Sequence, residues 1–375
     1  MDATDTTPPR VEDPLQWGYS LANVREILLP CLDAIGARSV LEIGAYEGDL
    51  TAHLLDWAKG SGATVAGMDP LPPDRLRELA AARPELELIE ETSHDYLAGL
   101  DSLPDAVVID GDHNYYTLSR ELELIDRIAP GGSMPLLLFH DLLWPHARRD
   151  TYYAPERIPD EHRQPVGNDV GLAPGNPGVA EYGLPFVWAA LEEGGPANGT
   201  LTAIEDFMAD RQGLRLAIVP AFFGFGLIWH EDAPWSQAVA DLIAPYDRNP
   251  VLARLEGNRV EHLVAGQGRA REMVVLRAEY DALVEKCAKQ EEILRRLEAS
   301  GAFRSRSGSR ACVSAASRRS RARRFARRCR TRPRRGNERA RRWPVAPARR
   351  RSRPRSAPAS RARRAAARSA SGSVR

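Results

Sequence analysis

The chain has 375 residues, a formal net charge of +1, four cysteines and a hydrophobic fraction of 43%. A length of this order suggests about two domains, or one large domain with appendages. No apolar run approaches the roughly 18–20 residues of a membrane span. The acidic, proline-bearing start lacks a secretory signal pattern, and the cysteines form neither a metal motif nor a disulfide framework. These features exclude an integral membrane protein and predict a cytoplasmic one.

The charge is distributed unevenly along the chain. Residues 301–375 contain 27 arginines, no lysine and one acid, Glu338, which gives this tail about +26 and leaves residues 1–300 at about −25. The tail has few apolar residues beyond Ala and Val, so we predict that it is disordered. Its composition is also that of a GC-rich gene read in the wrong frame. Our hypothesis is that this end is not native, which resequencing of the gene would test.

The rest of the chain divides into a flexible start (1–18), a body (19–250) and a helical segment (251–300). Strands and helices alternate through the body, which is typical of an α/β fold with a doubly wound, mostly parallel sheet, here of seven strands. The first helix covers residues 21–35, and we expect Pro30 to kink or split it. The expected strands lie within 40–48 and at 64–68, 86–89, 106–110, 135–139, 214–219 and 224–229. Further helices are expected at 50–58, 74–82, 116–128 and 202–209.

The stretch VLEIGAYEG, residues 40–48, combines a buried strand with a loop that opens a helix. Gly44 and Gly48 let the backbone bend sharply and let a ligand approach it closely. The free N–H groups at the start of the next helix favour an electron-rich ligand. The spacing is not that of a dinucleotide fingerprint, and Glu42 instead precedes the first glycine by two residues. Asp69, at the tip of the second strand, is placed to bind both hydroxyls of a ribose.

The loop E-x-G-x-x-x-G and Asp69 together resemble the class I S-adenosylmethionine-dependent methyltransferases, whose first motif has this form and whose second strand ends in an acid. The resemblance implies a Rossmann-like methyltransferase fold and S-adenosyl-L-methionine as the cofactor. It also implies cofactor contacts from the loop and from the ends of the next three strands, at Glu42, Gly44, Ala45, Tyr46, Gly48, Asp69, Ser93 and Asp110.

Polar side chains follow the fourth and fifth strands. Asp110, Asp112 and His113 come after the fourth strand, and His140 and Asp141 after the fifth. Strands one, four and five are neighbours in a sheet of this winding, so we expect these side chains to converge beside the glycine loop. They suit a divalent cation such as Mg²⁺ or Mn²⁺, and they equally suit a general base. The alternatives are structural: Asp110 as a helix cap, Asp112 as a turn residue and His140 as a hydrogen-bonded neighbour.

The strings IDGDHNYY and LLLFHD resemble the subgroup that methylates macrolide and aminocoumarin sugars. In that subgroup, acids after the fourth and fifth strands hold a divalent metal beside the hydroxyl that accepts the methyl group. By position, Asp110 and Asp141 match those acids, and Asp112 is a third candidate ligand. The resemblance implies catalytic roles for His113, Asp110 and His140. His140 departs from the pattern, because relatives often have two adjacent acids there.

Residues 142–182 interrupt the sheet with about forty residues rich in proline, glycine and charge. A loop of this length without regular structure is usually functional, so we predict a lid-like insertion. The residues expected to contact an anionic or sugar-bearing acceptor are Arg148, Arg149, Tyr152, Tyr153 and Arg163. The alternative is a surface loop with solvated charges.

Residues 269–299 carry a heptad pattern. Met273, Tyr280, Cys287 and Leu294 form one series, and Leu276, Leu283 and Leu297 form the other, with Gln290 in its gap. This predicts a coiled coil of about three to four heptads, and with it a homo-oligomer. The alternative is a single amphipathic helix packed on the body.

These observations and the resemblance predict a metal-assisted O-methyltransferase, and a hydroxyl of a sugar, glycan or natural product as its acceptor is what the resemblance alone implies. A nucleic-acid methyltransferase with the basic tail as anchor is one alternative, and the acidic body argues against it. A non-catalytic assembly protein is another, and the intact loop with Asp69 argues against that.

Overall fold

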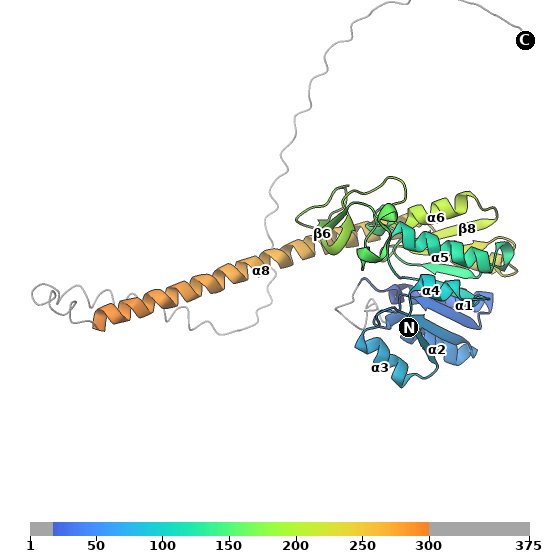
Figure 1. The fold of residues 1–375 in the computed structure, drawn as a ribbon, viewed down its shortest axis with the longest axis horizontal. Helices are drawn as coiled ribbons and strands as arrows, with labels where there is room; N and C mark the ends of the chain where they lie inside the picture. Colours follow the sequence, from blue (N-terminus) through green and yellow to red (C-terminus); the bar gives the residue numbers. More distant parts are fainter. Residues whose placement is uncertain (1–17, 300–375) are drawn as a thin grey trace, which may run out of the picture. The chain divides into compact units, whose positions relative to one another are not determined.

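The computed structural model describes residues 18–299, except for the side chains of residues 271 and 272. The predicted tail and almost all of the predicted flexible start lie outside the described residues. Seven strands form one sheet in the order β3-β2-β1-β4-β5-β9-β8 (Figure 1). Their bounds are β1 Ser39–Ile43, β2 Thr64–Met68, β3 Leu86–Ile89, β4 Ala106–Ile109, β5 Leu136–Phe139, β8 Leu214–Val219 and β9 Phe225–His230.

The sheet is parallel except for one strand. β1 pairs with β2 and β4, β2 with β3, and β4 with β5, all in parallel, whereas β9 runs antiparallel to both β5 and β8. The prediction of a mostly parallel, seven-stranded, Rossmann-like methyltransferase sheet is therefore confirmed. The carboxyl ends of β1, β4 and β5 lie at one edge of the sheet, where such sheets bind ligands.

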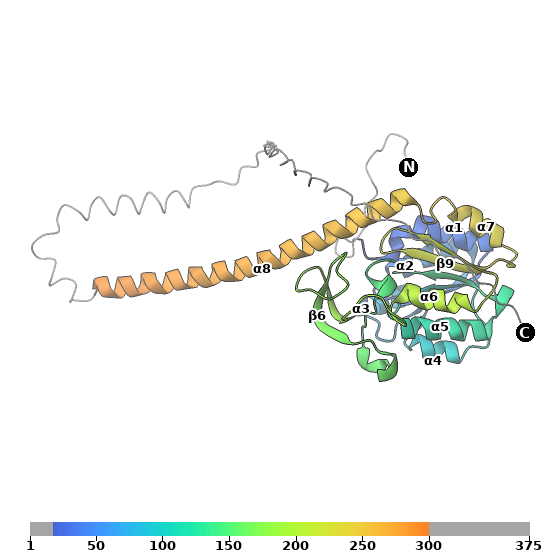
Figure 2. The ribbon, with the colours of Figure 1, turned by 90° about the horizontal axis from the view of Figure 1, so that it is seen from above.

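Helices cover both faces of the sheet (Figure 2). Val40, Val108 and Leu136 belong to the core under α1, α2, α3 and α7, whereas Leu41 and Val107 belong to the core under α4, α5 and α6. Strands β4 and β5 are buried along their whole length, which explains why they are continuous apolar runs. The helices are α1 Arg25–Ile35, α2 Asp49–Ser61, α3 Asp74–Ala82, α4 Ser93–Ala98, α5 Tyr115–Ile128, α6 Thr200–Ala209 and α7 Ser236–Ile243.

The first helical segment is not split at Pro30, where we expected a kink or a split, but it does change from a 3₁₀ turn to an α-helix after Val24. A 3₁₀ turn, Leu21–Val24, comes first and is capped by Ser20, whose hydroxyl accepts the N–H of Ala22. Helix α1 then runs through Pro30 without ending there. Because the α1 residues on either side of this proline are buried in the core, their packing holds the helix together although Pro30 lacks an N–H group.

The insertion has more regular structure than predicted. β6, Val166–Leu172, and β7, Leu184–Ala190, form an antiparallel two-stranded sheet, preceded by 3₁₀ turns at His146–Arg148, Pro155–Arg157 and Asp160–His162. The sequence of β6, VGNDVGL, hides this strand because Gly, Asn and Asp are depleted in strands. The second glycine of β6, Gly171, is required by close approach, since a Cβ there would lie 2.0 Å from the carbonyl oxygen of Tyr182.

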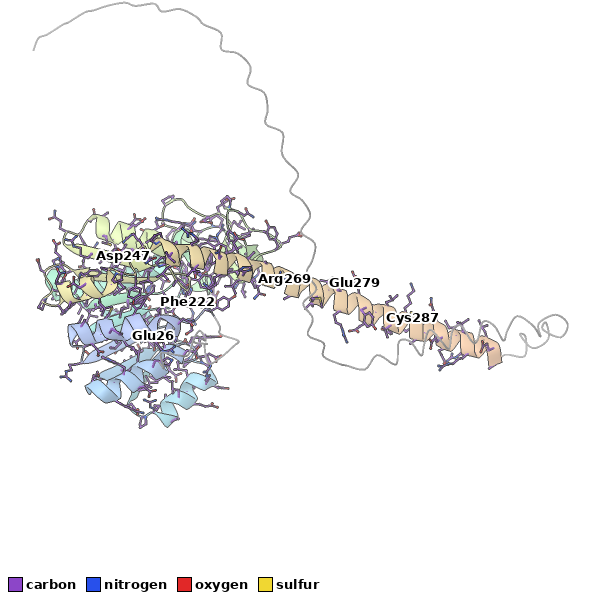
Figure 3. The ribbon with its side chains drawn as sticks, turned by 180° about the vertical axis from the view of Figure 1, so that it is seen from behind. Glu26, Phe222, Asp247, Arg269, Glu279 and Cys287 are labelled. Atoms are coloured by element: carbon purple, nitrogen blue, oxygen red, sulfur yellow. The ribbon has the colours of Figure 1, made fainter. Side chains whose placement is uncertain are left out.

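Helix α8, Pro250–Ala299, confirms the predicted C-terminal helical extension. The described residues up to Cys287, 18–287, belong to one compact unit, and the described part of the second unit, residues 288–299, is helical. Figure 3 labels Arg269, Glu279 and Cys287 along α8, where the heptad residues Met273 and Tyr280 are 64% and 60% exposed. No helix among residues 18–299 is long and apolar enough to cross a membrane.

Candidate active site

Two glycines in left-handed conformations shape the loop after β1. Gly44 has a φ of 89°, and a Cβ at this position would lie 2.1 Å from the carbonyl oxygen of Asp110. Gly48 has a φ of 79° and forms the N-cap of α2. The first glycine therefore lets the loop pack against the end of β4, and the second lets helix α2 begin directly after the loop.

Glu42 is buried at the end of β1, with 3% of its surface exposed. The hydroxyl of Thr51 in α2 donates a hydrogen bond of 2.6 Å to its Oε2 atom. Burial raises the pKa of Glu42 to about 8, although the hydrogen bond from Thr51 acts in the opposite direction. The carboxyl group thus connects the strand to the helix that follows the loop.

A cavity of about 720 Å³ lies at the carboxyl ends of β1, β4 and β5. Its wall is formed by the loop after β1, by the residues that follow β4 and β5, and by strand β7. Gln267 of α8 also contributes to the wall. The structure places eight of the predicted site residues in this wall: Glu42, Gly44, Ala45, Tyr46, Asp110, His113, His140 and Asp141.

Four predicted site residues do not line the cavity, and Gly48 is one of them. Asp69 follows β2, and its Oδ1 atom accepts the N–H of Leu71 at 2.8 Å. Ser93 begins α4 and donates a hydrogen bond of 2.5 Å to Glu121. The fourth residue, Asp112, accepts hydrogen bonds at both carboxylate oxygens, from the backbone N–H of residue 153 and the side chain of residue 114. Only the second is a local contact of the kind that a turn residue makes, whereas the first joins the end of β4 to the insertion.

Two carboxylates and three imidazoles converge in the cavity wall. In the paired strands β4 and β5, residue 109 pairs with residue 139, so Asp110 and His140 follow side by side. His140 Nδ1 lies 3.1 Å from Asp110 Oδ1, and His113 Nε2 lies 2.8 Å from Asp141 Oδ2. His146 Nε2 is 3.8 Å from the same Asp141 oxygen. Asp141 is thus the centre of the group, and its backbone φ of 60° is unusual for a residue with a side chain.

Charge and burial set the protonation of this group. Burial alone would lower the pKa of His140, but the charges of Asp141 and Asp110 outweigh it and raise the pKa to about 9. The same balance, with Asp141 as the main charge, raises the pKa of His113 well above its usual value. Burial dominates at His146 and lowers its pKa to about 3. Burial would raise the pKa of Asp141, but the charge of His140 holds it well below its usual range.

His140 is held from both sides of its ring. Its Nε2 atom donates a hydrogen bond of 2.7 Å to the carbonyl oxygen of Phe222, which lies in the turn before β9. The backbone N–H groups of Phe222 and Phe223 donate to the carboxylate of Glu256 in α8, at 3.0 and 2.8 Å. Both phenylalanines have positive φ, at 50° and 65°. Glu256 therefore stabilises the turn that holds His140.

Sequence reasoning missed His146 and Glu256 as parts of this site. His146 lies five residues after Asp141, in the segment that was assigned to the insertion. Its position shortly after a strand end was a usable signal, because side chains that follow β5 return to the same edge. Glu256 gave no such signal, since its partners are backbone N–H groups far away in the sequence.

The predicted acceptor residues of the insertion fall into two groups. Tyr152 and Tyr153 line the cavity. Arg148 instead pairs with Glu205 of α6, and Arg149, which is 1% exposed, donates to the backbone carbonyls of residues 190, 177 and 178. Arg149 therefore supports the fold of the insertion.

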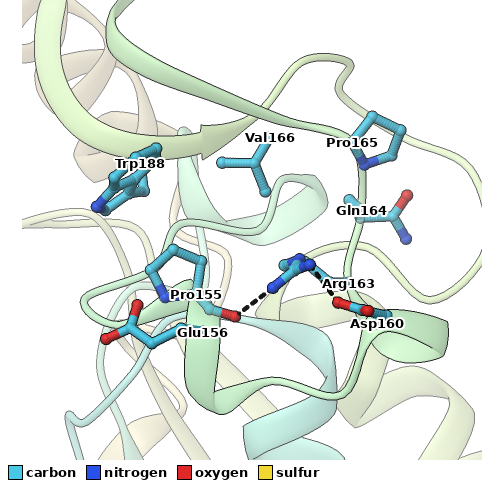
Figure 4. A pocket seen from close by; sticks show the side chains of 8 residues that line it. All are labelled: Pro155, Glu156, Asp160, Arg163, Gln164, Pro165, Val166 and Trp188. Atoms are coloured by element: carbon cyan, nitrogen blue, oxygen red, sulfur yellow. Dashed lines mark hydrogen bonds and ion pairs between the residues drawn. The ribbon is translucent and has the colours of Figure 1, made fainter.

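Arg163 lines a smaller cavity of about 600 Å³ beside the hairpin (Figure 4). Its guanidinium donates to the carbonyl of Pro155 at 2.8 Å and to the carboxylate of Asp160. The Arg163 guanidinium, which we expected to contact an anionic acceptor, is therefore already paired within the chain. Trp188 of β7 lines both cavities.

Comparison with known proteins gives a family model that matches part of the chain. Residues 41–142 match the model of a family described as a methyltransferase domain. The matched segment begins in β1 and ends just after β5, so it includes the glycine loop, Asp110, His113, His140 and Asp141. No curated protein matches the chain.

Several solved structures resemble this chain at low identity. The methyltransferase PaMTH1 of Podospora anserina, solved with bound SAH, is 15% identical, with 60% of this chain and 91% of that chain covered and a TM-score of 0.36. An O-methyltransferase family protein of Burkholderia thailandensis is 14% identical, with 57% and 58% covered and a TM-score of 0.33. The O-methyltransferase NcsB1 from neocarzinostatin biosynthesis, in complex with S-adenosylmethionine and 2-hydroxy-5-methyl naphthoic acid, is 13% identical, with 56% and 55% covered and a TM-score of 0.33. At this level of similarity, none of these ligands carries over to this chain.

Proposed function

This chain contains a class I S-adenosylmethionine-dependent methyltransferase domain, and from that premise we propose that it methylates a hydroxyl group of a sugar, glycan or other natural product, assisted by a divalent cation. The observation that supports the proposal is that the glycine loop and the carboxylate–imidazole group line one cavity. A cofactor at the loop and an acceptor at Asp110 would then lie side by side, as direct transfer between them requires.

The proposed cofactor site uses the loop and the strand ends beside it. Gly44, Ala45 and Tyr46 line the cavity and would lie along S-adenosyl-L-methionine. Asp69 uses Oδ1 in its own turn, and we assign its second carboxylate oxygen to the ribose hydroxyls. Glu42, fixed by Thr51, supports the loop from within. Gly48 starts α2, and Ser93 at the start of α4 is assigned to the adenine side.

The transfer breaks the S–CH₃ bond of the cofactor and forms an O–CH₃ bond on the acceptor, with S-adenosylhomocysteine and a proton as the other products. Because the sulfonium already activates the methyl group, the protein has to align the acceptor oxygen and accept its proton. The side chain of Asp110 is 22% exposed and that of Asp141 is 8%, so Asp110 is the carboxylate that an acceptor reaches. His113, oriented by its 2.8 Å contact with Asp141, is assigned to take the proton.

The carboxylates of Asp110 and Asp141 are suited to bind a cation as well as to support His113 as the base. Asp141 Oδ1 is buried and has no hydrogen-bond partner among the described residues, so this carboxylate has unused capacity for a positive charge. When bound there, a divalent cation would lower the pKa of the acceptor hydroxyl and offset the carboxylate charge that raises the pKa of His113.

The test is a methyl-transfer assay with the full-length chain, S-adenosylmethionine labelled in its methyl group, and separate panels of glycosides, phenols and RNA. We expect label on a hydroxyl of a glycoside or related natural product. His113→Asn should lower the rate by about 10²–10⁴-fold, because it removes the proton acceptor. His94→Asn is the matched control, since His94 contacts the carbonyl of Thr117 and does not line the cavity. Transfer to RNA alone, or equal rates in the two variants, would contradict the proposal.

Two further predictions concern the molecule beyond its chemistry. We propose that copies associate through residues 269–299, because apolar heptad residues of α8 are exposed there. We also place the protein in the cytoplasm, on its composition and cysteine usage.

A further inference from the structure

We propose that Asp110, His140 and Asp141 bind a divalent first-row transition ion, such as Zn²⁺, Fe²⁺ or Co²⁺, with Nδ1 of His140 as one ligand. The site should prefer such an ion to Mg²⁺. This inference deepens the proposed function and rests on it for the chemical role of the ion. The three side chains follow the neighbouring strands β4 and β5 and lie together in the cavity wall.

The contact between His140 and Phe222 determines which ring nitrogen carries a hydrogen. A carbonyl oxygen can only accept, and that of Phe222 lies 2.7 Å from Nε2, so Nε2 is the protonated nitrogen. Nδ1 then faces Asp110 Oδ1 at 3.1 Å. A lone pair on Nδ1 would repel this carboxylate, so the pair requires a cation between them, either a proton or a metal ion.

The distances suit ligands of one ion. Ligands that bond to a metal at about 2.1 Å are roughly 3.0–3.4 Å apart at octahedral or tetrahedral angles. His140 Nδ1 lies 3.1 Å from Asp110 Oδ1, which fits this range, and 3.7 Å from Asp141 Oδ2, which has to shorten by a few tenths of an ångström. All three ligand atoms lie within 4.8 Å of one another. A second observation is that Asp141 Oδ1 is buried and has no hydrogen-bond partner among the described residues, so this carboxylate can accept a cation.

The nitrogen ligand distinguishes between metals. Imidazole suits Zn²⁺, Fe²⁺ and related ions, whereas Mg²⁺ favours oxygen ligands and retains water. The preference for a transition ion therefore follows from Nδ1 of His140, the one nitrogen among the three proposed ligand atoms.

A second group, His113, Asp141 and His146, shares Asp141 with the first. It is the weaker candidate because His146 Nδ1 lies 2.9 Å from the hydroxyl of Thr151, which can donate or accept and leaves the tautomer open. His146 Nε2 is also 3.8 Å from Asp141, a longer distance than either contact of His140 with the carboxylates.

Helix α8 supports the proposed ligand indirectly. Glu256 accepts the N–H groups of Phe222 and Phe223, and this fixes the carbonyl that orients His140. Partners of this kind behind a metal-binding histidine typically change metal affinity by about 10–100-fold when they are removed. Glu256 is accordingly a positioning residue for the ion.

The experiment is a titration of the full-length, chelator-treated chain with Co²⁺, followed by the visible absorption of the bound ion. Four chains are compared: wild type, His140→Gln, His146→Gln and His162→Gln. The last is the matched control, because His162 is exposed and stacks on Tyr116 outside the cluster. Far-UV circular dichroism verifies that each variant is folded. A second pair, Glu256→Gln and the exposed Glu261→Gln, tests the support from α8.

We expect His140→Gln to weaken Co²⁺ binding at least about tenfold, and His146→Gln and His162→Gln to stay within about threefold of wild type. Glu256→Gln should weaken binding about tenfold, with Glu261→Gln unchanged. A large excess of Mg²⁺ should leave the Co²⁺ spectrum in place.

Three results would overturn the metal site: no Co²⁺ spectrum in wild type, displacement by Mg²⁺, or loss in His146→Gln with retention in His140→Gln. Titration of the same samples with S-adenosylmethionine separates this proposal from the proposed function. Cofactor binding without Co²⁺ binding would overturn the metal site alone, and the reverse would overturn the methyltransferase proposal alone.

Discussion

Glu42 is an acid that the fold holds in its neutral form. It is 3% exposed, and burial raises its pKa from 4.5 to about 8. A carboxyl group whose pKa is higher in the folded state contributes its full stability below the unfolded pKa and loses it as the pH rises to the folded pKa. Glu42 therefore destabilises the protein progressively between about pH 4.5 and pH 8.

We predict that Glu42→Gln gains stability relative to wild type as the pH rises through this window, by about 1–3 kcal/mol at pH 8 in the absence of cofactor. The amide cannot ionise, and its oxygen can still accept the hydroxyl of Thr51. The measurement is the thermal unfolding midpoint of both proteins from pH 5 to pH 8.5. Glu91→Gln, at an exposed position, is the control. If the difference in unfolding midpoint between wild type and Glu42→Gln does not change with pH, the pKa of Glu42 is not raised in the folded protein. That result would contradict the prediction.

The sequence predicted the main residues of the cluster but not the contacts that orient them. Asp110, His113, His140 and Asp141 could be placed because each follows a buried strand of the parallel sheet. The carbonyl of Phe222 could not, since every residue type has one and this contact spans 82 positions in the sequence. Backbone partners of this kind become visible only with the fold.

At the scale of elements, predictions succeeded where one physical signal dominated. Strands β2 and β3 and helix α3 have the predicted bounds, because apolar runs and turn residues delimit them clearly. Strand β6 was missed because two of its buried positions are glycines and its exposed positions are Asn168 and Asp169. The first helix is not split at Pro30, because core packing outweighs the missing hydrogen bond there.

The self-association proposed for helix α8 leads to a further prediction. In the heptad pattern, Cys287 occupies a core position, and the structure leaves it exposed as a free thiol. Lys286 and Glu291 occupy the flanking positions that meet between chains in a parallel coiled coil, and their charges are opposite. A parallel, in-register pair of helices would therefore bring the two Cys287 side chains into one layer.

We predict that mild oxidation links most of the protein into disulfide-bonded dimers through Cys287. The background for the test carries Cys312→Ser and Cys329→Ser, so that the other thiols of the C-terminal part do not contribute. Addition of Cys287→Ser is the control and should abolish the cross-link without changing the molar mass measured by light scattering. A monomeric mass in both proteins would contradict self-association through α8.

At the scale of the whole molecule, one edge of the sheet gathers groups from distant parts of the sequence. The loop after β1, the ends of β4 and β5, strand β7 and α8 all contribute to one cavity. Residues 1–300 carry a net charge of about −25 and therefore repel nucleic-acid phosphates. This charge favours a small or neutral acceptor for the cavity. The central claim is that the cavity holds S-adenosyl-L-methionine against the glycine loop.

Calorimetric titration of the full-length chain with S-adenosyl-L-methionine tests this claim most directly. Gly44→Ala places a Cβ 2.1 Å from the carbonyl of Asp110, so we predict one site per chain in wild type and at least about 100-fold weaker binding in this variant. Gly60→Ala, where a Cβ meets nothing within 4 Å, should bind as wild type does. Asp69→Asn gives a second test if Gly44→Ala does not fold. A folded wild type that binds no cofactor, or equal affinity in all four proteins, would contradict the account.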